Sequence, residues 1–113
     1  MEDTNVTVLV GRLTKDADLK LFEELQVGFF TIATDRKKKK PDGSHTEEAS
    51  FFEVNTFGRY AEIIVPKLKK GIQVCVTGSL KQERWKDKKT QENRSRLVVT
   101  ADAIQILGGK NNV

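Results

Sequence analysis

The order of polarity patterns along this chain constrains its fold more than any other feature. Several stretches alternate apolar and polar residues with a period of two, which is typical of β-strands with one buried face. Between the third and the fourth of them, residues 59–70 break that period, because their apolar residues recur at helical spacing. The alternating stretches are residues 6–14, 27–35, 50–57, 73–82 and 96–107.

The interruption at residues 59–70 predicts a helix. Gly71 follows it as a stop signal. Pro66 removes one backbone donor and clashes with the preceding turn, so we expect this helix to be short or kinked. The apolar residues that share one helical face are Ala61, Ile64, Val65 and Leu68.

Three strands, a helix and two further strands are the layout of the OB-fold, a five-stranded Greek-key barrel that binds oligonucleotides. Gly11 interrupts the first strand, which favours the bulge or sharp bend that small barrels use at corners. Barrel closure is inferred from the layout, since an open sheet would show the same alternation. We therefore predict an all-β fold with one short helix. Residues 1–110 would form a single OB-fold domain, and residues 111–113 a short disordered C-terminus.

The third strand carries the first candidate binding surface. Phe51 and Phe57 fall on the face opposite the apolar one, at either end of Glu53 and Asn55. Flat aromatic rings open to solvent among polar groups are what unpaired bases need for stacking. A phenylalanine under a loop or in a subunit contact would produce the same pattern. The opposite, core-facing side would hold Phe52, Val54 and Thr56.

Two basic loops flank these strands. The connection 36–48 begins with five consecutive basic residues and contains the turn sequence Pro41-Asp42-Gly43. The second loop spans residues 84–95, and the chain as a whole carries a formal net charge of +4. Such loops create a positive electrostatic potential that attracts polyanions. A lysine run can also be merely solvated, or can resemble a nuclear localisation signal.

The sequence contains no pattern typical of an enzyme. His45 is the one histidine and Cys75 the one cysteine, so no Cys/His metal cluster and no internal disulfide are expected. The glycines match no phosphate-binding spacing. The start of the chain lacks the apolar core of a signal peptide, and no stretch is apolar over the length of a membrane span. We expect an intracellular binding protein without cofactor or metal.

Several motifs, taken in order, resemble the bacterial single-stranded DNA-binding protein (SSB) family over about residues 5–110. No single motif is decisive, but the ordered set with its glycines in register is specific. The matching segments are Val8-Leu9-Val10-Gly11-Arg12-Leu13-Thr14-Lys15-Asp16, Phe30-Thr31-Ile32-Ala33-Thr34, Phe51-Phe52-Glu53-Val54-Asn55-Thr56-Phe57-Gly58, Leu68-Lys69-Lys70-Gly71, Val74-Cys75-Val76-Thr77-Gly78-Ser79-Leu80 and Ile104-Gln105-Ile106-Leu107-Gly108.

This resemblance implies binding and protection of single-stranded DNA without sequence preference, in DNA replication, recombination and repair. The family's stacking positions fall on Phe51, Phe57 and Trp85, and a fourth, often aromatic, falls near Lys38. The candidate phosphate-binding residues, from the basic loops and from family-like positions, are Arg36, Lys37, Lys38, Arg59, Lys70, Lys81, Arg84, Lys86 and Arg96.

The resemblance also carries expectations about assembly and location. The family commonly forms homotetramers and acts in the bacterial cytoplasm, associated with the nucleoid. Its acidic, Phe-tipped tail docks replication and repair enzymes, whereas this sequence stops at Asn111-Asn112-Val113. Tail-mediated partners are therefore doubtful. Two other functions stay open: an RNA-binding OB-fold protein, and a tail-less OB-fold adaptor of a primosome or recombination complex.

Overall fold

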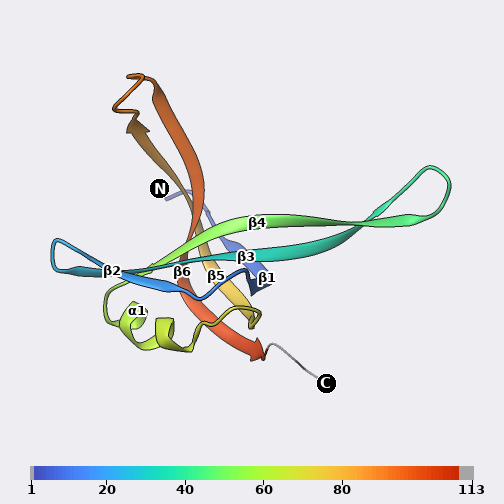
Figure 1. Cartoon of the computed structure of the whole chain (residues 1–113), viewed down its shortest axis with the longest axis horizontal. Coiled ribbons are helices and arrows are strands. Elements are labelled where there is room, and N and C mark those ends of the chain that lie inside the picture. The colour runs from blue at the N-terminus through green and yellow to red at the C-terminus, as the bar shows by residue number, and fades with distance from the viewer. Residues whose placement is uncertain (1, 110–113) are drawn as a thin grey trace.

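The structure is a computed structural model, and it describes residues 2–109. Most of these residues lie in strands, and two extended hairpins project from a central barrel (Figure 1). The predicted disorder of residues 111–113 lies outside the described residues. The elements are β1 (Thr7–Leu13), β2 (Asp18–Phe22), β3 (Leu25–Lys39), β4 (His45–Phe57), α1 (Gly58–Ile64), the 3-10 helix η1 (Val65–Lys67), β5 (Gln73–Lys86) and β6 (Asn93–Gly108).

The strands close into the predicted five-stranded barrel. They follow the order β1-β5-β6-β4-β3, and a further pairing of β1 with β3 completes the ring. All neighbours are antiparallel except β4 and β6, which pair in parallel at Val54–Val99 and Asn55–Thr100. The Greek-key OB-fold layout is thus confirmed, together with its helix between the third and fourth strands of the ring.

Glycines occupy two crowded positions of the barrel. At Gly11, where β1 turns from β5 toward β3, a Cβ would lie 2.5 Å from the carbonyl oxygen of Ala33. At Gly78 a Cβ would lie 1.9 Å from the carbonyl oxygen of Thr100, beside a shift in the β5–β6 register. Only a residue without a side chain allows the backbones to approach this closely. The packing therefore requires glycine at position 11.

The barrel core follows the sequence pattern. Ile32, Val54, Val74, Val76 and Val99 are completely or almost completely buried. The helical segment closes one end of the barrel with its predicted apolar face, Ala61, Ile64, Val65 and Leu68, all of them buried.

The helical segment is short, as predicted. Helix α1 ends at Ile64, and Pro66 lies at the start of the 3-10 helix, where a missing backbone donor costs least. Among residues 2–109, no helix is long and apolar enough to cross a membrane.

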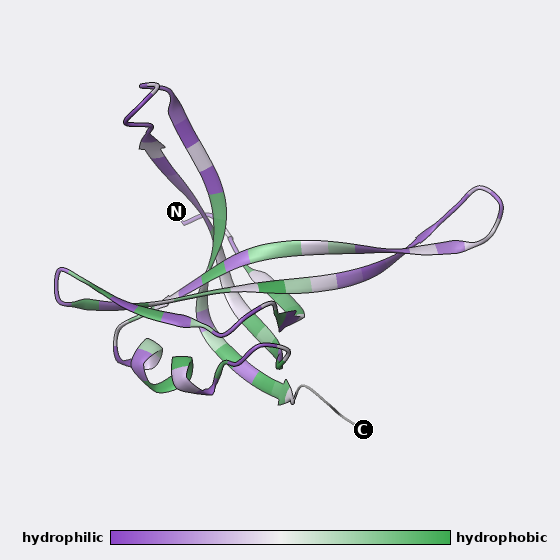
Figure 2. Ribbon diagram, in the orientation of Figure 1, coloured by the Kyte–Doolittle hydropathy of each residue, from purple (hydrophilic) through white to green (hydrophobic). Residues whose placement is uncertain are grey.

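Two predicted loops are wrong, and one strand was missed. Residues 36–48, taken as a loop, are mostly strand, because β3 and β4 run to a turn at residues 40–44. Half of residues 84–95 is strand, because β5 and β6 run to a turn at 87–92. The strand β2, which pairs with residues 25–29 of β3, was not predicted at all. The projecting hairpins are hydrophilic on both sides (Figure 2), so they lack the alternation that marks a half-buried strand.

Candidate nucleic-acid interface

The outer face of β4 presents two phenylalanines to solvent. Phe51 is 65% exposed and Phe57 37% exposed, while Val54 and Thr56, on the inner face, are buried. The predicted division of this strand into two faces is confirmed. Asn55 is the exception on the outer face, because it is only 4% exposed. Its neighbour across the parallel β4–β6 pair, Thr100, donates a hydrogen bond from its hydroxyl to Asn55 Oδ1 at 2.9 Å.

The strand register extends this outer face across β3 and β2. Directly opposite residues of paired strands share a face. Phe51 faces Ala33, Glu53 faces Thr31, and Asn55 faces Phe29, which in turn faces Asp18 of β2.

The same register sorts the basic run of β3 into two sets. Lys37 and Lys39 lie on the strand face that carries Phe51, because they are separated from Ala33 by even steps. Arg36 and Lys38 lie on the other face, opposite Glu48 and Thr46. The family's fourth stacking position, expected near Lys38, thus falls on the face away from Phe51.

Trp85 is joined to the outer face of β4 through Arg96. The guanidinium carbon of Arg96 lies 5.8 Å from the centroid of the Trp85 ring. The same guanidinium forms ion pairs with Glu53 of β4 at 3.1 Å and with Glu83 of β5 at 2.9 Å. Arg96 was predicted as a phosphate ligand, but its charge is shared with two carboxylates of the protein. Trp85 remains 45% exposed, which leaves ring surface open.

The other predicted basic residues are exposed but scattered. Lys81 shares the β5 face of Trp85 by parity, whereas Arg84 and Lys86 lie on the opposite face. Arg84 donates a hydrogen bond to Gln82 Oε1 at 2.7 Å. The two family-like positions lie at the helical segment: Arg59 in α1, two residues after Phe57, and Lys70 after η1.

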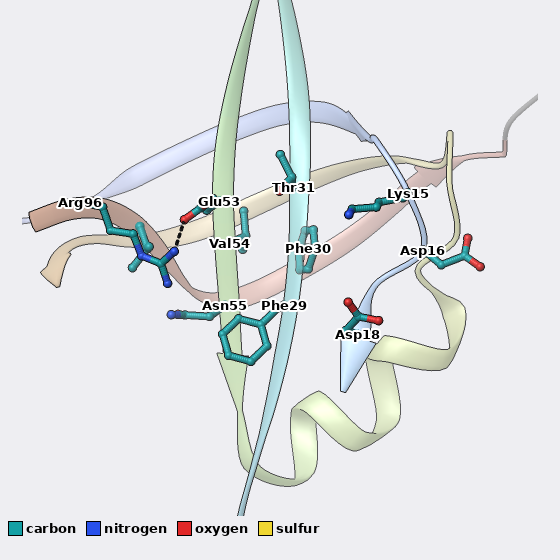
Figure 3. A pocket seen from close by; sticks show the side chains of 11 residues that line it. Lys15, Asp16, Asp18, Phe29, Phe30, Thr31, Glu53, Val54, Asn55 and Arg96 are labelled. Atoms are coloured by element: carbon teal, nitrogen blue, oxygen red, sulfur yellow. Dashed lines mark ion pairs between the residues drawn. The ribbon is translucent and has the colours of Figure 1, made fainter. Parts of the chain in front are cut away.

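A hollow of about 150 Å³ opens on this outer face (Figure 3). Phe29, Glu53, Asn55 and Arg96 are among the side chains that line it, and a dashed line in the figure marks the Glu53–Arg96 ion pair. Phe29 lies between Asn55 and Asp18, as the register requires.

Sequence reasoning missed the aromatic cluster around Phe29. Its ring is 6.1 Å from that of Phe22, in an edge-on arrangement, and Lys20 Nζ lies 5.7 Å from the Phe29 centroid. The available signal was the alternation of Asp18 and Lys20 with Leu19 and Leu21, which is too short to predict a strand by itself.

The turn of the β5–β6 hairpin is organised by Asp87. The backbone N–H groups of Lys89 and Thr90 donate to its Oδ1 at 2.8 and 3.2 Å, and Arg94 donates to Oδ2 at 3.2 Å. The two backbone bonds contribute most to holding the pKa of Asp87 below its usual value. At the other hairpin tip, hydrogen bonds from the Ser44 hydroxyl and backbone lower the pKa of Asp42 in the same way.

A closed barrel of this topology with exposed aromatic rings on its outer face defines the class of OB-fold oligonucleotide-binding proteins. Residues 4–107 match the model of the Single-strand binding protein family, and the chain belongs to that family. The family resemblance drawn from the sequence is thereby confirmed.

Relatives by sequence include the single-stranded DNA-binding proteins of Wolinella succinogenes and Borreliella burgdorferi. The first is 42% identical over 107 residues, which cover 94% of this chain and 65% of the relative. The second is 39% identical over 113 residues, which cover 99% of this chain and 75% of the relative. For the protein of Treponema pallidum, 40% identical, this chain spans 60% of the relative's length.

Two solved structures share the fold. A deletion mutant of the single-stranded DNA binding protein from Thermus aquaticus superposes with a TM-score of 0.82 at 27% identity, over 95% of this chain and 52% of that one. A Plasmodium falciparum SSB in complex with ssDNA superposes with a TM-score of 0.85 over 96% of this chain and 98% of that one. At 18% identity, the second comparison supports the fold alone.

Proposed function

We propose that this chain binds single-stranded DNA without sequence preference and protects it during DNA replication, recombination and repair, as a passive binding protein without catalytic activity. One observation carries the proposal: Phe51 and Phe57 stand exposed on an otherwise polar strand face, and Trp85 is tied to that face by Arg96. The names of the relatives support the choice of ligand. The corresponding location is the bacterial cytoplasm, with association to the nucleoid.

The three rings provide stacking platforms for bases. Phe51 and Phe57 are six residues apart on one strand, which corresponds to about 20 Å. A DNA strand that contacts both rings must therefore extend over several nucleotides along the outer face. Stacking contributes roughly 1–3 kcal/mol per base, and it tolerates every base because each has a π-face. These properties fit a binder that covers a strand irrespective of its sequence.

The phosphates would be met by the basic side chains around this path. Lys37 and Lys81 share strand faces with Phe51 and Trp85, respectively, and Arg59 follows Phe57 closely. Release of counterions from the strand makes such binding weaken as salt rises. The proposed phosphate-binding set is Arg36, Lys37, Lys38, Arg59, Lys70, Lys81, Arg84 and Lys86. Arg96, which the sequence also suggested, is proposed to position Trp85 instead, because Glu53 and Glu83 neutralise its charge.

Assembly into a homotetramer belongs to the same proposal. Val6, Val8 and Val10 are 70%, 59% and 47% exposed. Within the described part of the chain, residues 7–11 of β1 pair only with β5, so their other edge is open for a second copy. When several barrels of one assembly bind the same DNA strand, each barrel after the first binds in an intramolecular step, which raises the overall affinity.

The decisive experiment is a fluorescence titration with oligo-dT at two salt concentrations, on protein whose mass is measured by light scattering. The chain has one tryptophan, so the signal reports on Trp85 alone. We expect strong quenching, with an affinity that falls at high salt. Binding without quenching would contradict the role of Trp85, and absence of binding would contradict the function. A ribo-oligomer that competes as well or better would favour RNA, which alone offers a 2′-hydroxyl.

A further inference from the structure

The outer face of β4 continues across β3 to the β2–β3 hairpin as a group of apolar side chains. The register places Phe57 opposite Val27, and Val27 opposite Lys20 of β2. Phe29 and Phe22 lie on the same strand face, because each is two residues away from Val27 or Lys20. Phe29 is half-buried and Phe22 is 52% exposed. The aromatic surface of this face therefore extends beyond Phe57.

The burial of Val27 shows that these side chains pack on one another. Val27 is only 5% exposed, yet it lies outside the cluster of buried residues that forms the barrel core. Its neighbour Gly28 faces the helical segment, since a Cβ there would lie 2.7 Å from the side chain of Val65. Alternation turns Val27 the other way, so side chains of the outer face must cover it. Phe57 and Phe29 thus belong to an apolar layer that is separate from the core.

Phe29 lies at a level between the two phenylalanines of β4. It faces Asn55, which follows Phe51 by four residues and precedes Phe57 by two. Along the strands, Phe29 is thus roughly 13 Å from the level of Phe51 and roughly 7 Å from that of Phe57. In this interval β4 itself offers Glu53 and Asn55, neither of which carries a ring. A base stacked on Phe29 would fill the interval.

The ring of Phe29 is held by neighbours and borders an open space. Phe22 packs edge-on against it, with 6.1 Å between the ring centroids and 78° between the ring planes. Lys20 Nζ lies 5.7 Å from the Phe29 centroid. Phe29 also lines the hollow of about 150 Å³ on this face, where Figure 3 shows its ring next to Asn55. A ring that is fixed in position beside open space meets the requirements of a stacking surface.

Lys20 adds a positive charge to this surface. Its ammonium group makes no ion pair within 4.0 Å among residues 2–109, so it can neutralise a phosphate. Asp18 lies opposite Phe29, so we expect the phosphate on the side of Lys20. A ring beside an ammonium group suits a nucleotide, which combines a flat base with a phosphate. This charge, and the continuity with the outer face of β4, favour single-stranded DNA over a protein as the occupant.

We propose that Phe29 is a further base-stacking residue, and that Lys20 binds the phosphate next to the stacked base. The base belongs to the same DNA strand as those on Phe51 and Phe57 and lies between them. The inference rests on the proposed function, to which it adds a fourth ring and a contact on the β2–β3 hairpin.

The first test removes the ring without emptying its place. Phe29→Leu keeps an apolar side chain beside Val27 but has no π-face. It should weaken binding to oligo-dT about tenfold, the scale of one stacked base. Phe29→Tyr keeps the ring and should restore the affinity. The control is Leu21→Ala, which truncates an exposed residue on the opposite face of β2 and should bind normally. Anisotropy of a labelled oligo-dT measures each affinity.

The second test places a fluorescent reporter at the site. Phe29→Trp combined with Trp85→Phe makes position 29 the one tryptophan of the chain, and oligo-dT should quench its fluorescence. Ile63→Trp combined with Trp85→Phe is the matched control. Ile63 is exposed on α1, which packs against the other face of β3, so its reporter should not be quenched when anisotropy shows the oligomer bound. A purely structural role of Phe29 predicts no quenching at position 29.

The third test concerns the charge of Lys20. Lys20→Gln should flatten the slope of log affinity against log salt by about 0.7, the contribution of one phosphate on a single strand. An unchanged slope would show that Lys20 binds no phosphate.

The outcomes separate this inference from the proposed function. If Phe29→Leu binds oligo-dT as tightly as the unaltered protein, or if the tryptophan at position 29 is not quenched by bound oligomer, the stacking site is wrong and the proposed function stands. If Phe29→Leu keeps the affinity but lowers the mass measured by light scattering, the ring serves a contact between copies of the chain, and the stacking site is wrong. If the unaltered protein binds no oligomer, both proposals are overturned.

Discussion

The two projecting hairpins carry similar basic side chains but use them differently. In the β3–β4 arm (residues 36–48), the run Arg36–Lys40 makes no ion pair within 4.0 Å among residues 2–109. In the β5–β6 arm (residues 84–95), Arg94 pairs with Asp87 at 3.2 Å and with Glu92 at 3.8 Å. Arg96, at the base of that arm, is held by Glu53 and Glu83.

This difference separates two roles of positive charge. Unpaired lysines can neutralise phosphates and so release counterions from the nucleic acid, which contributes directly to a salt-dependent affinity. The charge of an arginine that is ion-paired with carboxylates is largely neutralised, so it attracts a phosphate only weakly. Its planar guanidinium group can still stack on an aromatic ring and hold that ring in place. We infer that the β3–β4 arm supplies unpaired positive charge that attracts the phosphates. The ion pairs in the β5–β6 arm and at its base instead hold Trp85 in position.

The largest loss of affinity for single-stranded DNA should come from removing two of the proposed stacking rings. The double variant Phe57→Ala and Trp85→Ala should weaken binding to oligo-dT by about 2–6 kcal/mol, since each stacked base contributes roughly 1–3 kcal/mol. Anisotropy titration measures the loss. Ile63→Ala, which truncates an exposed apolar residue of α1, is the control and should bind normally. Full affinity in the double variant would refute stacking at these positions.

A smaller effect should separate the two arms by their response to salt. Changing Lys37, Lys38 and Lys39 to Gln should weaken binding at low salt. It should also flatten the slope of log affinity against log salt, by about 0.7 for each phosphate that the variant no longer binds. The measurement is a titration series across salt concentrations.

The matched comparison for this series is Arg96→Gln in the other arm. It should lower affinity by releasing Trp85 and leaving Glu53 and Glu83 unneutralised, but it should keep the salt slope. A slope that falls as it does for the lysines would show that Arg96 contacts phosphate directly, and the contrast between the arms would then disappear.

The smallest effect concerns the tip of the β5–β6 arm at low pH. The pKa of Asp87 is lowered from 3.8 in the folded chain, so the hydrogen bonds to its carboxylate are fully present above that value. They should be lost only as the pH falls through the lowered pKa. The NMR amide shifts of Lys89 and Thr90 should therefore titrate with a midpoint below 3.8 and stay constant between pH 5 and 8. A midpoint above 3.8 would contradict the assigned hydrogen bonds.

The parts predictable from sequence are those in which one strand face is buried. Alternation located the five barrel strands and placed Phe51 and Phe57 on the outer face, because burial imposes a period of two. The arms and β2 escaped prediction because both of their faces meet solvent. There, backbone pairing holds the strands. The side chains of the arms carry no period imposed by burial, and the alternation in β2 extends over too few residues to predict a strand.

The candidate site was predictable only where its parts come from one strand. Arg96, Glu53 and Glu83 lie on three different strands, so only the folded register reveals that they share their charge. The burial of Asn55 likewise depends on the parallel pairing with β6, in which Thr100 lies opposite. No local pattern in the sequence encodes these long-range partners.

The position of β6 has a consequence for the synthesis of this protein. The last strand of the barrel in chain order lies between β5 and β4 in the ring, and its residues pair along nearly the whole of β5. A nascent chain that stops before Asn93 therefore leaves the long edge of β5, and the edge of β4 at Val54 and Asn55, without their partners and cannot close the barrel. Folding of the barrel must be completed after translation of nearly the whole domain, and until then its edges are open to neighbouring chains.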